Sequence, residues 1–232
     1  MLVGHFSTAL VAHQKVPCGS LLYFLVISQL QDILWSIFHY AGLEVTGPDD
    51  VFNATLQSLT VDMLYSHDLL PQLVWMLLAF VIGKALFKSN TVGLVGAMLV
   101  LGHFVLDLIS GHPHHVFGAD SVDISLGLYA SNAYLAVLIE AVFTAAMMIY
   151  FFRQEARTSV VRTRKNKAAI IALFVFGILY MFSIATISLR DWLSLPEFDL
   201  GFATTMPNLI VTYVSLLLIL LYLLPKKTNM NT

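Results

Sequence analysis

Residues 91–110 read TVGLVGAMLVLGHFVLDLIS, and the only ionisable side chains among them are His103 and Asp107. An uninterrupted apolar run of about 20 residues is the length that an α-helix needs to cross the hydrocarbon core of a bilayer. Because His103 and Asp107 are four positions apart, a helix places them on one face, one turn from each other. This stretch therefore predicts a membrane-spanning helix that carries a polar site.

The rest of the chain repeats this pattern without the polar pair. Of the 232 residues, 58% are hydrophobic and only 11% are charged, which excludes a soluble globular domain. Five further apolar windows are long enough to span a membrane: 20–43, 69–87, 131–152, 168–189 and 204–224. Residues 2–14 are also apolar but reach only about 20 Å as a helix, and no basic residue precedes them as in a signal peptide. We expect an all-α, multi-pass transmembrane bundle of six clear spans and one short N-terminal membrane helix, forming a single integral membrane domain over residues 1–232.

Charged residues are separated along the chain. Eleven of the twelve basic residues fall on alternate connections, Arg190 being the exception. They are Lys15, Lys84, Lys88, Arg153, Arg157, Arg162, Arg164, Lys165, Lys167, Lys226 and Lys227. The complementary connections hold acidic residues, among them Asp49, Asp50, Asp120, Asp123, Asp191, Glu197 and Asp199. The positive-inside rule then predicts an exterior N-terminus, a cytoplasmic C-terminus and a basic cytoplasmic loop over residues 153–167. That loop also has the composition of a site for anionic lipid headgroups or a partner.

Ionisable residues inside apolar spans are costly and are therefore candidates for function. Measured from the basic ends of their helices, Asp32, His103 and Glu140 all lie at a depth of about 18 Å, His5 at about 14 Å and Asp107 at about 24 Å. We expect one buried polar site in the outer half of the membrane. Three residues at the exterior ends of helices are placed to close its mouth: His39, His67 and Asp68.

The chemistry of these groups favours a metal. Cys18 is the only cysteine, so a bound ion must be held by histidines and carboxylates, the ligands of Zn²⁺, Mn²⁺ or non-haem iron. Zinc is the first choice, because His and carboxylate sites are common in hydrolytic zinc enzymes. The same residues also suit a proton or ion relay in a transporter, or hydrogen bonds that only pack helices in a scaffold. The sequence Gly-His-Pro-His-His from Gly111 adds His112 as a secondary candidate at the exterior interface, where the proline favours divergent side chains.

Four short segments resemble the membrane-bound metal-dependent hydrolases of bacterial inner membranes, of the LexA-regulated, YdjM-like type. Gly4-His5 is similar to the family's N-terminal Gly-His, and Gln31-Asp32 falls at its Pro-Asp. Residues 65–70, YSHDLL, resemble its Thr-His-Ser-Leu-Leu, and residues 101–107, LGHFVLD, resemble its Ser-His-x-x-x-Asp, which a proline follows, here Pro113. The resemblance implies metal binding by His5, Asp32, His67, His103 and Asp107.

The chain departs from this family at two places. Leu34 and Trp35 stand where the family often continues with Asp and His, and Asp62 and Met63 replace a His-Arg pair. We therefore treat Asp62, with His39 and His112, as a secondary ligand candidate. The sequence as a whole predicts a metal-dependent hydrolase of an ester or phosphoester bond, with Glu140 and Asp68 as catalytic carboxylates. We expect the bilayer as its environment, a bacterial inner membrane as its location, a lipid as a substrate candidate and no nucleic-acid partner.

Overall fold

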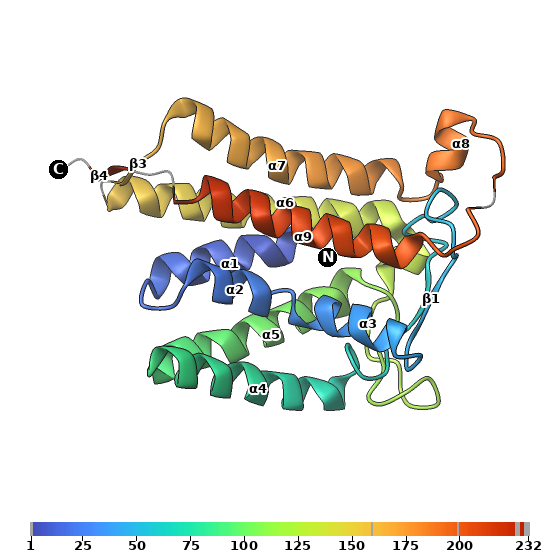
Figure 1. The fold of residues 1–232 in the computed structure, drawn as a ribbon, viewed down its shortest axis with the longest axis horizontal. Helices are drawn as coiled ribbons and strands as arrows, with labels where there is room; N and C mark the ends of the chain where they lie inside the picture. The colour runs from blue at the N-terminus through green and yellow to red at the C-terminus, as the bar shows by residue number, and fades with distance from the viewer. Residues whose placement is uncertain (1, 159, 199, 226–227, 230–232) are drawn as a thin grey trace.

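The computed structural model describes residues 2–158, 160–198, 200–225 and 228–229; the predicted positions of Asp199, Lys226 and Lys227 lie outside this range. The helices are α1 (Val3–Lys15), α2 (Leu21–Ile27), α3 (Leu30–Tyr40), α4 (Leu69–Phe87), α5 (Asn90–Ser110), α6 (Leu128–Arg157), α7 (Arg164–Ser183), α8 (Leu189–Leu193) and α9 (Thr205–Leu223). The strands are β1 (Val45–Gly47), β2 (Thr60–Asp62), β3 (Val160–Val161) and β4 (Thr228–Asn229), paired as two short antiparallel two-stranded sheets, β1 with β2 and β3 with β4. The prediction of an all-α membrane bundle is confirmed, and Figure 1 shows the long helices running side by side.

Five helices in the described residues are long and apolar enough to cross a membrane, and six spans result if α2 and α3 are taken together. The predicted continuous helix over residues 20–43 is wrong in one respect, because α2 and α3 meet at an angle of 58°. At the break, the Ser28 hydroxyl donates to the Leu25 carbonyl, and the Gln29 amide bonds to the carbonyl of Val26, three residues back. Such side-chain bonds to the backbone compete with a regular helical ladder.

The basic end of the molecule is more helical than predicted. Helix α6 continues through Arg157, so Arg153 and Arg157 belong to its last turns, and the connection to α7 is short. In that connection Arg162 is buried and bonded by both Nε and Nη2 to the Glu155 carboxylate, at 2.7 and 2.8 Å. The same guanidinium donates to the carbonyl oxygens of Leu223 and Leu224. One buried ion pair therefore joins the ends of α6, α7 and α9.

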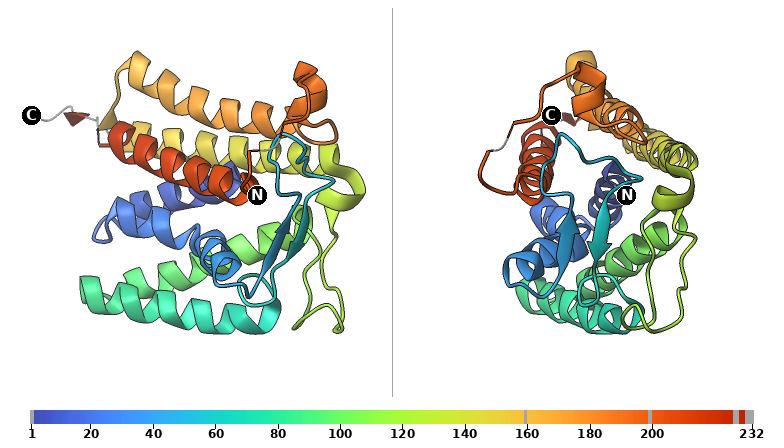
Figure 2. Two further views of the ribbon diagram at one scale, coloured as in Figure 1. Left: turned by 45° about the vertical axis from the view of Figure 1, so that its right-hand side comes forward. Right: turned by 90° about the vertical axis from the view of Figure 1, so that its right-hand side faces the viewer.

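The short helix α1 lies in the centre of the bundle. It packs against α2, α5, α6 and α7, and the end-on view in Figure 2 shows it surrounded by longer helices. Its contact with α7 is close, because a Cβ at Gly177 would clash with Val3 Cγ1. Buried apolar residues pack around the half of α1 that runs toward the basic end, among them Leu10 of α1, Phe24 of α2 and Val100 of α5.

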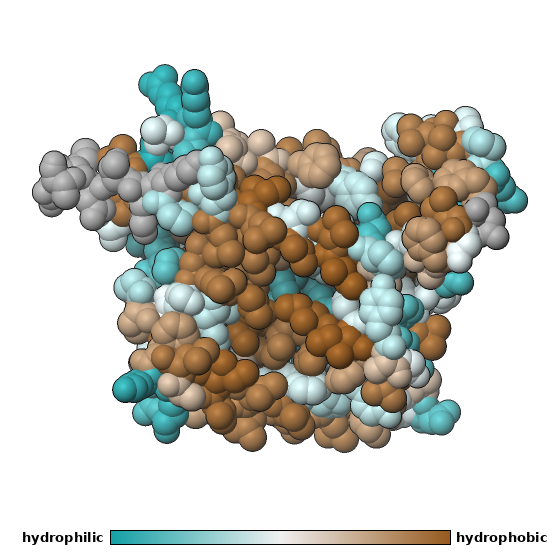
Figure 3. Space-filling model, in the orientation of Figure 1, coloured by the Kyte–Doolittle hydropathy of each residue, from teal (hydrophilic) through white to brown (hydrophobic). Residues whose placement is uncertain are grey.

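The end opposite to the basic one is closed by loops. The β1–β2 hairpin lies there with α8, and the buried Arg190 bonds to Asp50 and Asn53 of the hairpin connection. Arg190, the one basic residue predicted on this side, is therefore internally paired. Figure 3 shows a broad apolar surface between the two more hydrophilic ends, as a bilayer-embedded bundle requires.

Candidate metal centre

The five residues predicted as metal ligands lie together and are buried, although they come from four separate parts of the chain. His5 is on α1, Asp32 on α3, His67 in the turn before α4, and His103 and Asp107 on α5. Nε2 of His103 is 3.1 Å from Asp107 Oδ2, and Nε2 of His5 is 3.2 Å from Asp107 Oδ1. Of the groups with similar predicted depths, His5, Asp32, His103 and Asp107 meet here, and His67, which was predicted further out at the mouth of the site, lies among them.

Two overlapping groups within this centre have the spacing of a metal site. His5, His103 and Asp107 form one, and Asp32, His67 and His103 form the other, with all candidate ligand atoms of each group within 4.8 Å of one another. His103 belongs to both. His67 Nε2 links them, lying 3.6 Å from Asp32 Oδ1 and 3.8 Å from Asp107 Oδ2.

The tautomer of His103 follows from its outer hydrogen bond. Its Nδ1 lies 2.8 Å from the carbonyl oxygen of Ser28, which can only accept, so Nδ1 carries the proton. In a neutral ring, Nε2 is then a bare lone pair, and it faces Asp107 at 3.1 Å and Asp32 at 3.8 Å. The Ser28 carbonyl sits at the break between α2 and α3, so the bend supplies this acceptor.

His67 is oriented in the same way through a serine. The Ser66 hydroxyl donates to Glu44 Oε2 at 2.8 Å, so Ser66 Oγ accepts from His67 Nδ1, also at 2.8 Å. Glu44 is held in turn by the backbone amides of Tyr65 and Ser66, which donate to its Oε1. The Glu44–Ser66–His67 relay thus turns the bare Nε2 of His67 toward Asp32 and Asp107. Burial raises the pKa of Glu44 above its ordinary value.

With protons on the Nδ1 atoms of His67 and His103, their Nε2 atoms are acceptors that face carboxylate oxygens, which are acceptors too. Two imidazole lone pairs and two carboxylates converge among buried side chains, an arrangement that a cation between them would stabilise. Within the described residues, His103 Nε2 and His5 Nδ1 are buried without any hydrogen-bond partner. Metal-binding histidines show this pattern: the outer nitrogen donates to a carbonyl or carboxylate, and the inner one binds the ion. The donor set therefore fits a divalent cation.

Glu140 and Asp68 make hydrogen bonds to backbone amides. Glu140 Oε1 accepts from the amides of Val3 and Gly4, at 2.8 and 3.0 Å, and so caps the N-terminus of α1 from α6. Asp68 accepts from the amides of His115 and Gly118, and so holds the loop after α5. Neither belongs to the two groups of metal-spaced residues.

The secondary candidates are placed differently from the sequence-based expectation. Asp62 is exposed on β2, and His39 lies near the end of α3 with its ring against Tyr40, so neither reaches the centre. His112 was expected at a wet interface, but it is buried, as is His114. Burial lowers the pKa of both imidazoles to about 4.

His114 is a residue that the sequence analysis underrated. Its Nδ1 bonds to the His112 carbonyl at 2.6 Å, which leaves Nε2 bare and without a partner in the described structure. Its ring lies edge-on to that of His67, with centroids 5.6 Å apart. Pro113 was expected to turn the side chains of His112 and His114 in different directions at the surface. Instead, the loop folds back over the site, and both histidines lie in the wall of its cavity.

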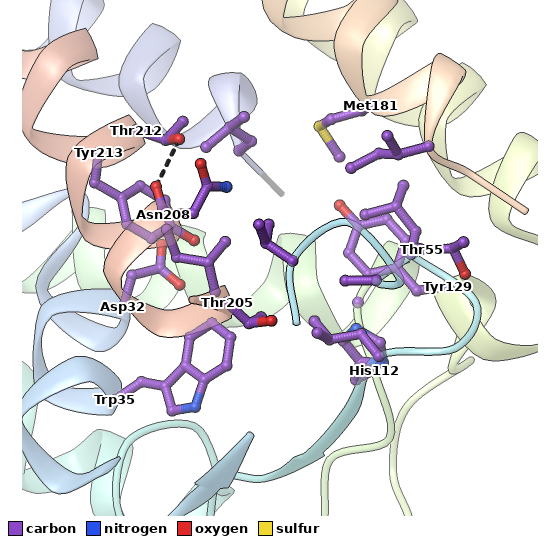
Figure 4. Close-up of a pocket in the computed structure, with 18 of the residues that line it drawn as sticks. Asp32, Trp35, Thr55, His112, Tyr129, Met181, Thr205, Asn208, Thr212 and Tyr213 are labelled. Atoms are coloured by element: carbon purple, nitrogen blue, oxygen red, sulfur yellow. Dashed lines mark hydrogen bonds between the residues drawn. The ribbon is translucent and has the colours of Figure 1, made fainter. Parts of the chain in front are cut away.

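A cavity of about 130 Å³ opens from the centre toward the loop-covered end, and its wall includes Asp32, His67 and Asp107. The rest of the wall is mainly apolar and comes from α6, α7, α9 and the segment 51–63. Figure 4 shows Tyr213, Asn208 and Thr212 of α9 near Asp32 on one side, and Tyr129 and His112 on the other. Tyr213 and Asp32 lie next to each other in the wall of the cavity. No described Lys or Arg side chain lines the cavity.

Sequence reasoning missed this contribution of α9. Thr205, Asn208 and Thr212 recur at helical spacing within an apolar span, and that periodicity was the available signal. It also missed the amides of Gln31 and Gln72, which bond to each other at 3.0 Å beneath the His67 turn. Gln72 also donates to the Ser66 carbonyl at 2.8 Å, so the two glutamines stabilise the turn that carries Ser66 and His67.

Comparison of the chain with family models, with curated proteins and with solved structures gives no match.

Proposed function

We propose that the chain is a membrane-embedded, metal-dependent hydrolase that cleaves an ester or phosphoester bond in an amphipathic, lipid-type substrate. The observation that carries this proposal is the orientation of two bare imidazole nitrogens, on His67 and His103, toward the paired carboxylates of Asp32 and Asp107. The resemblance of the surrounding motifs to membrane-bound metal-dependent hydrolases agrees with it.

Asp32, His67, His103 and Asp107 would hold the ion, and His5 would complete the set. A divalent ion such as Zn²⁺ supplies a Lewis acid and lowers the pKa of bound water toward neutrality, and Mn²⁺ or iron suits the same donors. Two aspartates offset the charge of one such ion, so the loaded centre is electrically neutral in a low-dielectric setting.

The chain's own residues orient these donors and the substrate. Glu140 fixes the start of α1 and with it the position of His5. Tyr213 lines the cavity beside Asp32, where a substrate oxygen would approach the ion. We assign Tyr213 to substrate orientation, and Glu140 to positioning rather than to proton transfer.

The cavity favours an amphipathic substrate. Its apolar walls suit an acyl chain, and Figure 3 shows a hollow in the apolar face between α9 and the α2–α3 pair, with hydrophilic residues at its bottom. A lipid can enter such a hollow from within the bilayer. Because no described Lys or Arg lines the cavity, a neutral carboxylic ester suits it better than an anionic phosphoester.

We place the protein in a bacterial inner membrane with the centre near the outer surface, on the basis of the basic residues at the opposite end. A proton or ion relay would need polar groups between the centre and the basic end. The packed apolar residues found there, such as Leu10, Phe24 and Val100, support hydrolysis over transport.

Metal content tests the centre. Detergent-purified protein should carry near-stoichiometric zinc or manganese by plasma mass spectrometry, and His103→Ala and Asp107→Ala should lose it while remaining monodisperse. His39→Ala is the matched control, because this histidine lies outside the centre. Equal metal content in the His39 and His103 variants would contradict the proposal.

Substrate class is tested with esters of increasing chain length. Neutral nitrophenyl esters with long acyl chains should be cleaved in a chelator-sensitive reaction, faster than bis-nitrophenyl phosphate. Leu209→Trp, which fills the cavity away from the ligands, should reduce turnover of long-chain esters more than of short ones. Turnover that survives chelation and His103→Ala would overturn the assignment.

A further inference from the structure

A groove between α6 and α7 lies outside the metal centre and opens on the surface of the bundle. Two rows of side chains at four-residue spacing form its walls: Ala141, Ala145, Ile149 and Arg153 on α6, and Lys167, Ile171, Val175 and Leu179 on α7. The helices run side by side in opposite directions (Figures 1 and 2), so each row ends in a cation at the same, basic end of the molecule.

The groove has the shape of a site for one acyl chain. The small side chains of Ala141 and Ala145 leave the space, and Ile149 and Val175 border it, each about half exposed. From Ala141 to Arg153, α6 rises about 18 Å. One leaflet of hydrocarbon is about 15 Å thick, so the apolar part of the groove matches the depth of a single leaflet.

The cations at the mouth of the groove are available for a ligand. In the described part of the chain, neither Arg153 nor Lys167 forms an ion pair, whereas the nearby Arg162 is fully committed to Glu155. Lys167 lies over the ring of Phe152, with Nζ 4.9 Å from the centroid, and Phe152 itself lines the groove. This contact keeps the ammonium beside the mouth.

We propose that the α6–α7 groove binds an anionic phospholipid from the leaflet at the basic end, with its headgroup phosphate between Arg153 and Lys167 and one acyl chain along the two rows. Basic pockets between membrane helices bind anionic lipid headgroups in this way. The site is independent of the metal centre, because no residue lines both this groove and the catalytic cavity.

Native mass spectrometry of the full chain tests the proposal, with phosphatidylglycerol and phosphatidylcholine of equal chain length as probes. The protein should retain one phosphatidylglycerol at detergent concentrations that remove phosphatidylcholine. The double variant Arg153→Gln/Lys167→Gln should weaken phosphatidylglycerol binding about thirtyfold, from two lost charge contacts. The matched control is Arg157→Gln/Lys165→Gln, which makes the same charge change outside the groove and should leave retention unchanged.

A second variant separates the groove from its charges. Val175→Trp places an indole in the groove at a half-exposed position that the fold can accommodate, and it should reduce retention of phosphatidylglycerol with both cations present. Equal retention of the two lipids by the unaltered protein would overturn the proposal. So would equal losses in the groove and control double variants, since the attraction would then be a property of the whole basic end.

Discussion

At the scale of single residues, the centre depends on groups that do not themselves face it. Ser66 separates the Glu44 carboxylate from His67, and it transmits the orientation from one to the other through two bonds of 2.8 Å. Without this serine, the proton of His67 is free to move to Nε2, and the lone pair leaves the site.

Replacement of Ser66 by alanine should therefore lower zinc affinity about 10- to 100-fold, the range found when outer-shell partners of metal ligands are removed. Titration against a competing chelator measures this effect. Ser110→Ala is the control, because Ser110 is equally buried and, among the described residues, its hydroxyl donates to the Leu106 carbonyl of its own helix and not to the centre. Similar zinc affinity in the two variants would refute the relay.

The candidate ligands are predictable from sequence, whereas the residues that support them are not. The four-residue spacing of His103 and Asp107 in an apolar span marks both as candidates. Asp32 is marked by its position in the middle of another apolar span. The roles of Glu44, Ser66 and His114 depend on loops folding back over the site, and no local pattern marks such a long-range contact. Tyr213 is likewise indistinguishable in sequence from a packing or interface tyrosine.

At the scale of elements, α1 is held by a charge from another helix. The first amides of any helix have no partner within it, and Glu140 satisfies those of Val3 and Gly4 from α6. These hydrogen bonds fix the start of the helix that carries His5. The close packing of Val3 against Gly177 of α7 holds the same helix from another side.

Glu140→Ala should destabilise the protein by about 1–3 kcal/mol, because it leaves the buried amides of Val3 and Gly4 without an acceptor. Glu140→Gln retains an acceptor oxygen and should cost less. Thermal unfolding in detergent, together with metal content, checks both variants. If Glu140→Gln abolished ester turnover with stability and metal content intact, Glu140 would be a proton-transfer group instead of a positioning residue.

The element boundaries illustrate what a hydropathy window detects. Helices α4, α5 and α9 begin and end within one residue of the predicted windows, because charged or polar residues flank them closely. The α2–α3 bend and the extension of α6 to Arg157 were not predicted. Both depend on backbone bonding and on packing, to which average hydropathy is insensitive.

At the scale of the whole molecule, the two ends are closed by different means. The basic end is joined by the buried pair of Glu155 and Arg162, and the other end by Arg190 with Asp50 and Asn53. Each arrangement joins segments that are distant in sequence, and the candidate metal centre lies between the two ends.

Glu155→Gln should lower the stability of the bundle by about 3–5 kcal/mol, because it leaves the Arg162 charge buried and uncompensated. Metal content per folded molecule should not change, since Glu155 lies about 22 Å along α6 from Glu140. Thermal unfolding in detergent measures the loss, with the exposed carboxylate of Glu197 altered to Gln as the control. A drop of the same size in both variants would contradict a specific role for the pair.

The bend at Ser28 has a consequence for how this sequence can diverge. The acceptor is a backbone carbonyl, which every residue has whatever its side chain. It nevertheless determines which nitrogen of His103 is protonated. Substitutions around Ser28 and Gln29 that restore a straight helix would withdraw that acceptor and leave every ligand residue in place. Among descendants of this chain, the identity of residues 28–29 should therefore covary with the presence of His103, and a copy that keeps all five ligands but straightens the helix should be a poor metal binder.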